Sequence, residues 1–282
     1  MFFYTTREKC ILLNTGEEIR EFDCCQHEAD TRIFFHISVY ESRGGNRIPF
    51  IVDAEDTDVL AIAACVAHKS LHPIYLYRRG FVYDCRRMCS QEISSVIVQL
   101  HALTDADAIS GFYGSSKQTI FGRVAKSEDA KRLLADLGKI LEMSNRCKED
   151  IEEFTIKYVY NDKKSESLPQ ARASKWRSLK RKTTSRIPPV ADTLLHHMQR
   201  ANYQAFIWLS YDDPSSPPSP LQHGWIQENG RVLPIKHSLP PLPRNLEELL
   251  ITAEESHEGS SDDEADCESD IEVDSFDESD NE

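Results

Sequence analysis

The sequence predicts an α/β fold built around a parallel sheet. In the first half of the chain, short apolar segments typical of strands alternate with segments whose apolar side chains recur at helical spacing. This alternation is typical of parallel strands that are joined by helices. Acidic side chains also gather where a strand is expected to meet a helix, in the sequence IVDAEDTDVL at 51–60. A chain of 282 residues is long enough to bury a sizeable core.

Each element of the α/β domain, expected over residues 1–126, has its own local signal. Asp56 precedes a short apolar stretch, and its carboxylate is well placed to cap a helix. Two apolar runs flank Arg79-Gly80, a sequence typical of a turn. The expected elements, in chain order, are a strand over 9–13, helices over 27–40 and 57–68 around a strand over 49–52, strands over 73–77 and 81–83, and a helix over 92–103.

The second half of the chain is expected to be mainly helical. Residues 127–210 are rich in charge and carry no strand signal, and 191–209 form a further helix. Residues 211–253 combine a Pro-rich linker with a β-hairpin, because Asn229-Gly230 lies between two apolar arms. A last short helix is expected over 245–251.

The charge of the chain is unevenly distributed. Residues 254–282 hold fifteen acidic and no basic side chains, so removing them from the net charge of −14 leaves +1 for the rest. A tail of this composition is expected to be disordered. It is either a solubilising tail or a mimic of nucleic acid. The rest of the chain is nearly neutral and can still bind a nucleic acid through local basic patches.

Composition also narrows the class of protein. The eight cysteines show neither a disulfide framework nor zinc-ligand spacing. The longest apolar run, 59–67, is too short to span a bilayer, and the N-terminus lacks an apolar signal region. We expect an intracellular protein without a membrane partner or a small-molecule cofactor.

Three acidic clusters are expected to face one crevice. In a parallel sheet, the carboxyl ends of the strands and the first turns of the following helices lie together. Residues 28 and 30 lie about 200° apart on a helix, so Glu28 has to lie at an unwound first turn to face the same point as Asp30. Oxygen ligands of this kind suit Mg²⁺ or Mn²⁺. The clusters consist of Glu28 and Asp30, of Asp56 and Asp58, and of Asp107.

Three blocks carry a resemblance to a known family. They are HEADTRIFFH at 27–36, EDTDVLAIAA at 55–64 and HALTDADAISGFYGSSKQT at 101–119. In this order they resemble a metazoan family of uncharacterised, transposon-associated proteins with a PIN-like domain related to flap endonucleases, which usually reads HEEADTR, DTDV and ALTGCDTTSxFFGKGKKT. LLHHMQRANYQAFIW at 194–208 is similar to that family's C-terminal region. The resemblance spans residues 9–250.

The resemblance implies a PIN-like, flap-endonuclease-like parallel sheet and a metal-dependent nuclease acting on DNA or RNA. It implies that Lys117, in the loop 111–117, faces the nucleic-acid backbone. The implied catalytic residues are Asp56, Asp58 and Asp107, and the implied ligands of Mg²⁺ or Mn²⁺ are Glu28, Asp30, Asp56, Asp58 and Asp107.

The chain departs from the family pattern at three places. The usual first strand and its Asp are missing, with Glu21 and Asp23 as the candidates to replace that acid. Asp105-Ala106 replaces the Gly-Cys pair before the last Asp, and an acidic tail replaces a Cys-rich segment. We therefore expect an incomplete sheet that lacks its first strand, and the activity of this chain remains open.

A basic segment over 172–186 holds seven Lys and Arg and no acid. Such a segment is either a solvated helix face or a site for phosphate contact or nuclear import, which favours a nuclear over a cytoplasmic location. Together with Lys117, the residues expected to contact nucleic acid are Lys175, Arg177, Lys180, Arg181 and Lys182.

The acidic residues are also compatible with roles outside a nuclease. Any helix start favours Asp and Glu through capping and the helix dipole. A non-catalytic interaction protein, or a truncated remnant of a nuclease, would keep the same residues. A phosphatase with Asp56-Thr57-Asp58 as its nucleophile motif is disfavoured, because no lysine and acidic motif follow in the order such enzymes need.

Overall fold

The structure is a computed structural model. It describes residues 3–6, 8–12, 15–26, 28–44, 48–107, 109–179 and 184–239. The expected helix over 245–251, the acidic tail, and Lys180, Arg181 and Lys182 lie outside these residues. Met1–Ser238 forms one compact unit, which is the part described below.

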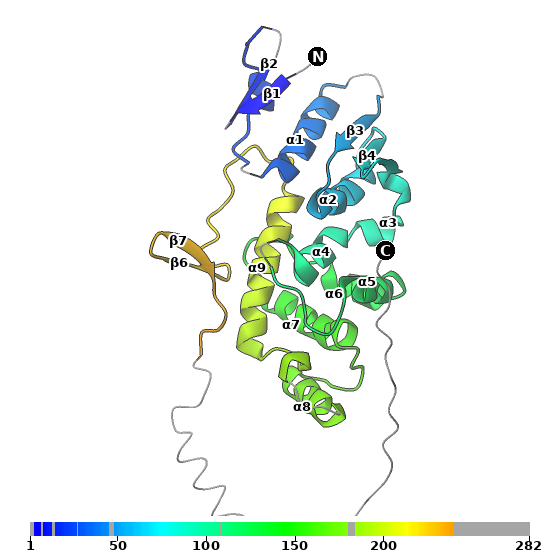
Figure 1. The fold of residues 1–282 in the computed structure, drawn as a ribbon, viewed down its shortest axis with the longest axis vertical. Helices are drawn as coiled ribbons and strands as arrows, with labels where there is room; N and C mark the ends of the chain where they lie inside the picture. Colours follow the sequence, from blue (N-terminus) through cyan, green and yellow to red (C-terminus); the bar gives the residue numbers. More distant parts are fainter. Residues whose placement is uncertain are drawn as a thin grey trace, which may run out of the picture. The chain divides into compact units, whose positions relative to one another are not determined.

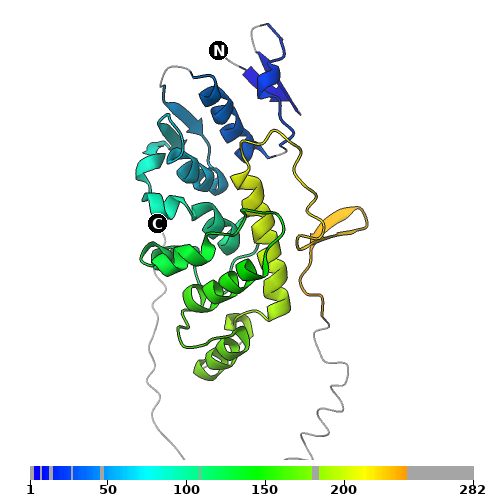
Figure 2. The ribbon, with the colours of Figure 1, turned by 180° about the vertical axis from the view of Figure 1, so that it is seen from behind.

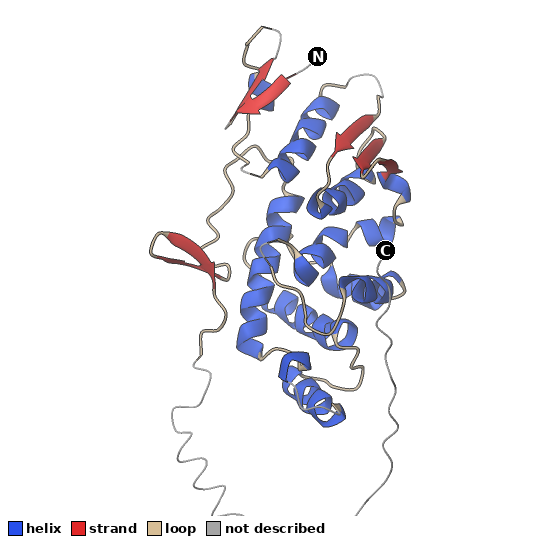
Figure 3. Ribbon diagram, viewed as in Figure 1, coloured by secondary structure: helices blue, strands red, loops and turns tan. Residues whose placement is uncertain are grey.

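The main sheet is smaller than expected and is mixed rather than parallel. Its three strands in the described part of the chain are β3 (Phe50–Asp53), β4 (Ile74–Arg78) and β5 (Phe81–Asp84), in that order. β3 and β4 are parallel and are joined through helix α2 (Thr57–Ala67), whereas β4 and β5 form an antiparallel hairpin (Figure 3). The hairpin forms because Arg79 and Gly80 both take positive φ, at 50° and 79°, which suits a tight two-residue turn.

Helices cover one face of this sheet. Helix α1 (Ala29–Ser42) packs beside α2 (Figure 1). Its Tyr40 ring contacts Phe50 of β3 edge to face. The opposite face exposes Ile51, Tyr77 and Val82, which are 69%, 40% and 62% exposed. The sheet is therefore covered on one side only within the described residues.

The N-terminal strands belong to a separate hairpin. β1 (Phe3–Thr6) pairs with β2 (Lys9–Leu12) in antiparallel register, and a short helical turn, η1 (Arg20–Phe22), follows. The strand expected over 9–13 exists, but it pairs with β1 and not with the three-stranded sheet. β3 is consequently an edge strand among the described residues.

A helical array follows the sheet (Figures 1 and 2). The single helix expected over 92–103 is two helices, because Val96, with φ −128° and ψ 5°, interrupts it. The long α9 matches the expected helix over 191–209 and packs along α4. The elements are η2 (Cys85–Arg87), α3 (Gln91–Ser94), α4 (Ile97–Asp105), α5 (Lys117–Ala125), α6 (Glu128–Leu134), α7 (Asn145–Phe154), η3 (Thr155–Val159), α8 (Leu168–Ser178), η4 (Thr184–Arg186) and α9 (Ala191–Leu209).

One continuous core joins the sheet to these helices. It extends from Phe34 of α1 through Ile62 of α2 and Leu103 of α4 to Trp208 of α9, all of them buried. The α/β region and the helical region that the sequence distinguishes thus share one core. Burial of such apolar surface is the main contribution to stability.

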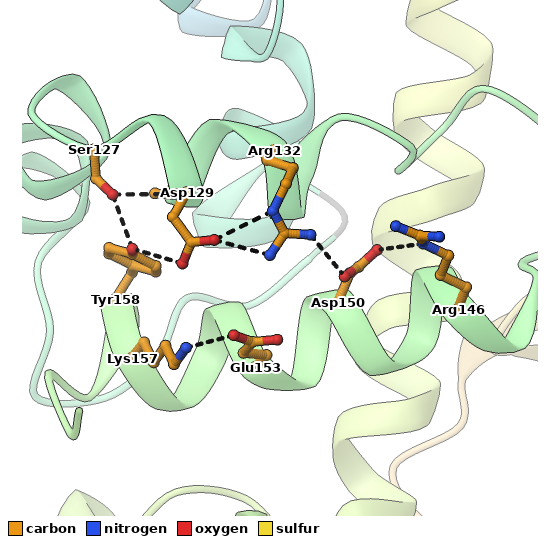
Figure 4. A network of polar contacts seen from close by, with 9 residues as sticks. Ser127, Asp129, Arg132, Arg146, Asp150, Glu153, Lys157 and Tyr158 are labelled. Carbon is orange, nitrogen blue, oxygen red and sulfur yellow. Dashed lines mark hydrogen bonds and ion pairs between the residues drawn. The ribbon is translucent and has the colours of Figure 1, made fainter. Parts of the chain in front are cut away.

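Polar contacts on the surface hold α6 to α7 and its π-helical continuation η3 (Figure 4). Arg132 binds Asp129 through Nε and Nη2 at 3.2 and 2.8 Å, and its Nη1 reaches Asp150 at 3.4 Å. The hydroxyl of Tyr158 donates to Asp129 at 3.1 Å. Each acid in this network faces a donor of opposite charge or a hydroxyl.

The expected hairpin over 224–234 is present. β6 (Trp225–Glu228) and β7 (Arg231–Pro234) are antiparallel, and Asn229 and Gly230 take positive φ of 49° and 76°, as a type I′ turn requires. No helix in the described part of the chain combines the length and the apolar character that a membrane span needs.

Candidate acidic site

The first turn of α2 places two of the predicted acids. Asp56 caps the helix, and its Oδ1 accepts a hydrogen bond from the backbone N–H of Asp58 at 2.8 Å. Asp58 is only 5% exposed and faces His101 of α4, with Oδ1 and Nε2 2.6 Å apart. His101 is also buried and lies against the ring of Trp208, with centroids 5.6 Å apart. The two aspartates therefore have different environments, one exposed and one paired in the interior.

Glu28 lies at the start of α1, where the backbone is unwound. Its φ and ψ of −84° and 135° are extended, so it is the residue before the helix and not part of it. This is the geometry that lets Glu28 and Asp30 face the same region. The side-chain amide of Gln204, from α9, donates to Oε2 of Glu28 at 3.3 Å.

The electrostatics of these acids are coupled. Burial raises the pKa of Asp30 to about 6, and repulsion from Asp56, Glu28, Asp58 and Asp107, in that order, adds to the rise. Carboxylates lower one another's acidity in this way when they lie close together in a partly desolvated place. Acids from three separate segments of the chain are thus brought into one electrostatic cluster.

Glu28 belongs to the same acidic cluster. Burial raises its pKa, the hydrogen bond from Gln204 and the nearby N–H of Trp208 oppose the rise, and the charges of Asp58 and Asp107 support it. Nε1 of Trp208 is buried and makes no hydrogen bond to the described residues, yet its N–H is near enough to favour the carboxylate. An indole donor is thus available beside the acids.

Lys117 supplies positive charge next to Asp107. Asp107 is exposed in the turn after α4, and Nζ of Lys117 donates to the backbone oxygen of Asp105 at 2.7 Å. Burial lowers the pKa of Lys117, while Asp105, Asp58 and Asp107 counteract that shift. The loop that was expected to face nucleic acid therefore brings its lysine to the acids.

Asp105 has a strained backbone. Its φ of 135° lies in the region that favours glycine. The side chain of Asp105 also adds negative charge beside Lys117.

The acids suit a divalent cation by their chemistry but do not form a ready coordination site. Clustered carboxylates are the ligands that Mg²⁺ and Mn²⁺ prefer. No group of three or more His, Cys, Asp or Glu in the described residues is arranged to hold a metal ion. Side-chain movement in the cluster would be needed to enclose one.

Four more acids that the sequence offered stay outside the cluster, and three of them have other partners. Glu21 pairs with Arg43, and Asp23 accepts from the backbone N–H of Cys10 at 2.9 Å, so neither takes the place of the missing first-strand acid. Glu55 accepts from the backbone N–H of Arg79 at 2.8 Å and holds the β4–β5 turn. Asp53, at the end of β3, is exposed.

Two residues of the predicted basic segment, Lys175 and Arg177, lie on α8, a helix that carries none of the acids of the cluster. Lys175 is half-buried and Arg177 exposed, both on α8, which lies near the end of α9 remote from α1 (Figures 1 and 2). Lys175 lines a cleft of about 530 Å³ together with Lys163 and Lys164. α9 has 19 residues and is therefore about 28 Å long, which separates these cations from the acids by a large distance.

Sequence reasoning missed three residues of the site: His101, Gln204 and Trp208. His101 lies inside an apolar helical pattern and carries no motif of its own, although it is the first residue of the third family block. Gln204 is 176 positions from Glu28 along the chain. No local pattern could have linked residues so far apart.

Comparison with known proteins does not place the chain in a family. No model of a known protein family matches it, and no curated protein or solved structure is detectably similar to it. The function therefore has to be argued from the acidic cluster and its surroundings.

Proposed function

We propose that this chain is a metal-dependent nucleic-acid phosphodiesterase with a PIN-like, flap-endonuclease-like domain of transposon origin. The observation that carries the proposal is the acidic cluster: Glu28, Asp30, Asp56, Asp58 and Asp107 come from three separate segments, yet burial and the charges of the other four raise the pKa of Asp30 to about 6. Holding like charges together reduces stability. A fold that keeps such a cluster gains from a cation bound there.

These five acids would hold Mg²⁺ or Mn²⁺. When bound, such ions lower the pKa of a water molecule and stabilise the leaving oxygen of a phosphodiester. In the absence of a cation, the cluster repels a phosphate group. Lys117 offers a positive charge that is coupled to Asp105, Asp58 and Asp107, and we assign it to contact with the nucleic-acid backbone.

The interior partners would keep the acids in position. His101 holds the Asp58 carboxylate at 2.6 Å, and Gln204 holds that of Glu28 at 3.3 Å. These contacts limit the rotamers of two acids, whereas Asp56 stays exposed. Lys175 and Arg177 on α8 would contact phosphates farther along a bound strand of DNA or RNA.

A second function is favoured by one observation. Glu21 and Asp23 are engaged by Arg43 and by the backbone of Cys10, so neither completes the set of acids that the resemblance implies. A non-catalytic interaction protein that descends from a nuclease would bind nucleic acid or metal without cleaving a strand.

Cleavage assays with Mn²⁺ test the proposal. Single-stranded and duplex DNA and RNA are incubated with the full chain, with its Asp56→Asn variant and with a chelator. Asparagine caps a helix as well as aspartate does, so this variant loses the charge and keeps the helix start. We expect the variant and the chelator each to reduce cleavage by about 100-fold or more, as is typical when a group that stabilises the transition state is lost.

Asp53→Asn is the matched control, because Asp53 lies three positions away and is not among the charges that raise the pKa of Asp30. It should cleave at the wild-type rate. Equal cleavage by wild type and Asp56→Asn would remove this acid from the mechanism. Mn²⁺ binding without cleavage of any of the four substrates would favour the non-catalytic function.

A further inference from the structure

A large cavity opens beside the acidic cluster. It lies between α2, α4 and α5 and has a volume of about 1000 Å³. Pockets of this size hold ligands as large as a nucleotide. Its apolar lining includes Leu60, Ala61, Ile97, Leu100, Ile109 and Phe121.

The cavity and the cluster share side chains. His101, whose Nε2 contacts Asp58, lines the cavity, and so do Asp107 and Lys117. A ligand in the cavity is therefore next to the acids. In contrast, the cleft beside α8 is lined mainly by polar side chains, among them three lysines, and contains none of the acids of the cluster.

The polar groups of the cavity, placed among apolar walls, include two carboxylate acceptors, those of Asp105 and Asp107, beside donors such as Lys117. The carboxylates of Asp105 and Asp107 can accept from amino and imino groups, and Gln118 can both accept and donate. Phe121 lines the cavity and is 36% exposed, so its ring is accessible to a ligand. Aromatic rings of this kind stack on bases, and carboxylates accept hydrogen bonds from exocyclic amino groups.

We propose that this cavity binds one unpaired nucleobase, with a preference for bases that carry an amino group, while the adjoining phosphate lies at the acidic cluster. The second half of this statement rests on the proposed function. Guanine suits the cavity best, because its N1–H and N2 amino group can both donate to one carboxylate. A base that is paired within a closed duplex cannot enter, so the substrate class is single-stranded or frayed nucleic acid.

Binding of nucleosides in the absence of metal tests the base pocket. The probes are guanosine, uridine and ribose, which lack the phosphate that the acids would repel. Calorimetric titration of the full chain should show guanosine binding more tightly than uridine and no binding of ribose. Ribose binding as tightly as guanosine would overturn the proposal.

Phe121→Ala removes the stacking ring and should weaken guanosine binding about tenfold. Phe81→Ala is the control, since Phe81 is an exposed phenylalanine on β5 that does not line the cavity. It should bind guanosine as the wild type does. Wild-type affinity in Phe121→Ala would overturn the proposal, provided that its thermal unfolding shows a folded chain.

Ala61→Phe fills the cavity from α2 and provides a second, independent variant, which should abolish guanosine binding. The outcome is separable from that of the cleavage assay. Cleavage that depends on Asp56, without guanosine binding, would reject only the base pocket. Guanosine binding that Phe121→Ala weakens, without cleavage, would reject the nuclease and leave the pocket in place.

Discussion

The acidic cluster and the α6–α7 surface shift the pKa of their carboxylates in opposite directions. At α6 and α7, Asp129 has Arg132 and Tyr158 as partners, and the hydrogen bonds from Arg132, above all, lower its pKa (Figure 4). In the cluster, burial and neighbouring acids raise the pKa of Asp30 to about 6. The first arrangement contributes to stability, whereas the second reduces it. Among the described residues of the cluster, five carboxylates lie near one lysine, Lys117, and this imbalance of charge is the basis of the proposed metal site.

The largest expected effect concerns the interior of the cluster. His101→Ala leaves the buried Asp58 without its partner and should reduce the free energy of unfolding by about 3 kcal/mol, because an unpaired buried charge is costly. Urea unfolding measures this loss. His101→Gln keeps a donor near Asp58 and should lose less. Equal losses in both variants would mean that the volume of the ring, and not its hydrogen bond, matters.

Asp30→Asn tests whether the crowding of acids reduces stability. The folded-state pKa, about 6, is above the unfolded value of about 3.9, so wild-type stability falls as the pH rises from about 4 to 6. The variant should be more stable at pH 7 by about 1 to 2 kcal/mol, after allowance for partial exposure. The difference should vanish below about pH 4. Chemical unfolding across this pH range measures the stability of both proteins. If the free energies of unfolding of wild type and variant changed with pH in parallel, the acids would not be reducing the stability.

Asp105→Gly separates backbone strain from charge at the edge of the cluster. Glycine accepts the positive φ of this position, and the variant should gain about 1 kcal/mol of stability. Asp105→Asn removes the charge and keeps the strain, so it should gain less. Differential scanning calorimetry of both variants decides between the two causes, and an equal gain would assign the effect to charge.

The smallest effect is expected at α6. Asp129→Asn should lose about 0.5 kcal/mol at low salt and less at high salt, because exposed ion pairs are weak and screened. The pKa of Asp129 is lowered in the folded state. The contribution of its carboxylate to stability is therefore present above the unfolded pKa and is lost as the pH falls through the folded pKa. Urea unfolding at two salt concentrations measures it. Asp136→Asn, at the exposed pair with Lys139, is the matched control and should show a similar small loss.

Several features followed from local side-chain chemistry. The capping carboxylate of Asp56 and the apolar residues after it predicted α2, and Asn229-Gly230 predicted the β6–β7 turn. The helix over 191–209 has the expected limits. These predictions hold because each signal and its structure involve residues that are neighbours along the chain.

The predicted sheet was wrong in one respect, for a physical reason. Alternating strands and helices indicated parallel pairing, but the link between β4 and β5 is too short for a crossover, and Arg79 takes the left-handed conformation that closes a hairpin. The break between α3 and α4 at Val96 was also missed, because the apolar periodicity continues across it.

The acidic site, too, was predicted in part from the sequence, and the rest of it was decided only by the tertiary structure. Residue types and their order along the chain were sufficient to select Glu28, Asp30, Asp56, Asp58 and Asp107. Only the packing of α9 and α4 against the first turns of α1 and α2 decided that Gln204 and His101 would hold two of these acids, and that a cavity would open beside them. A sequence pattern predicts how side chains a few helical turns apart are arranged. Burial and the coupling of charges depend on helices that come into contact only after folding.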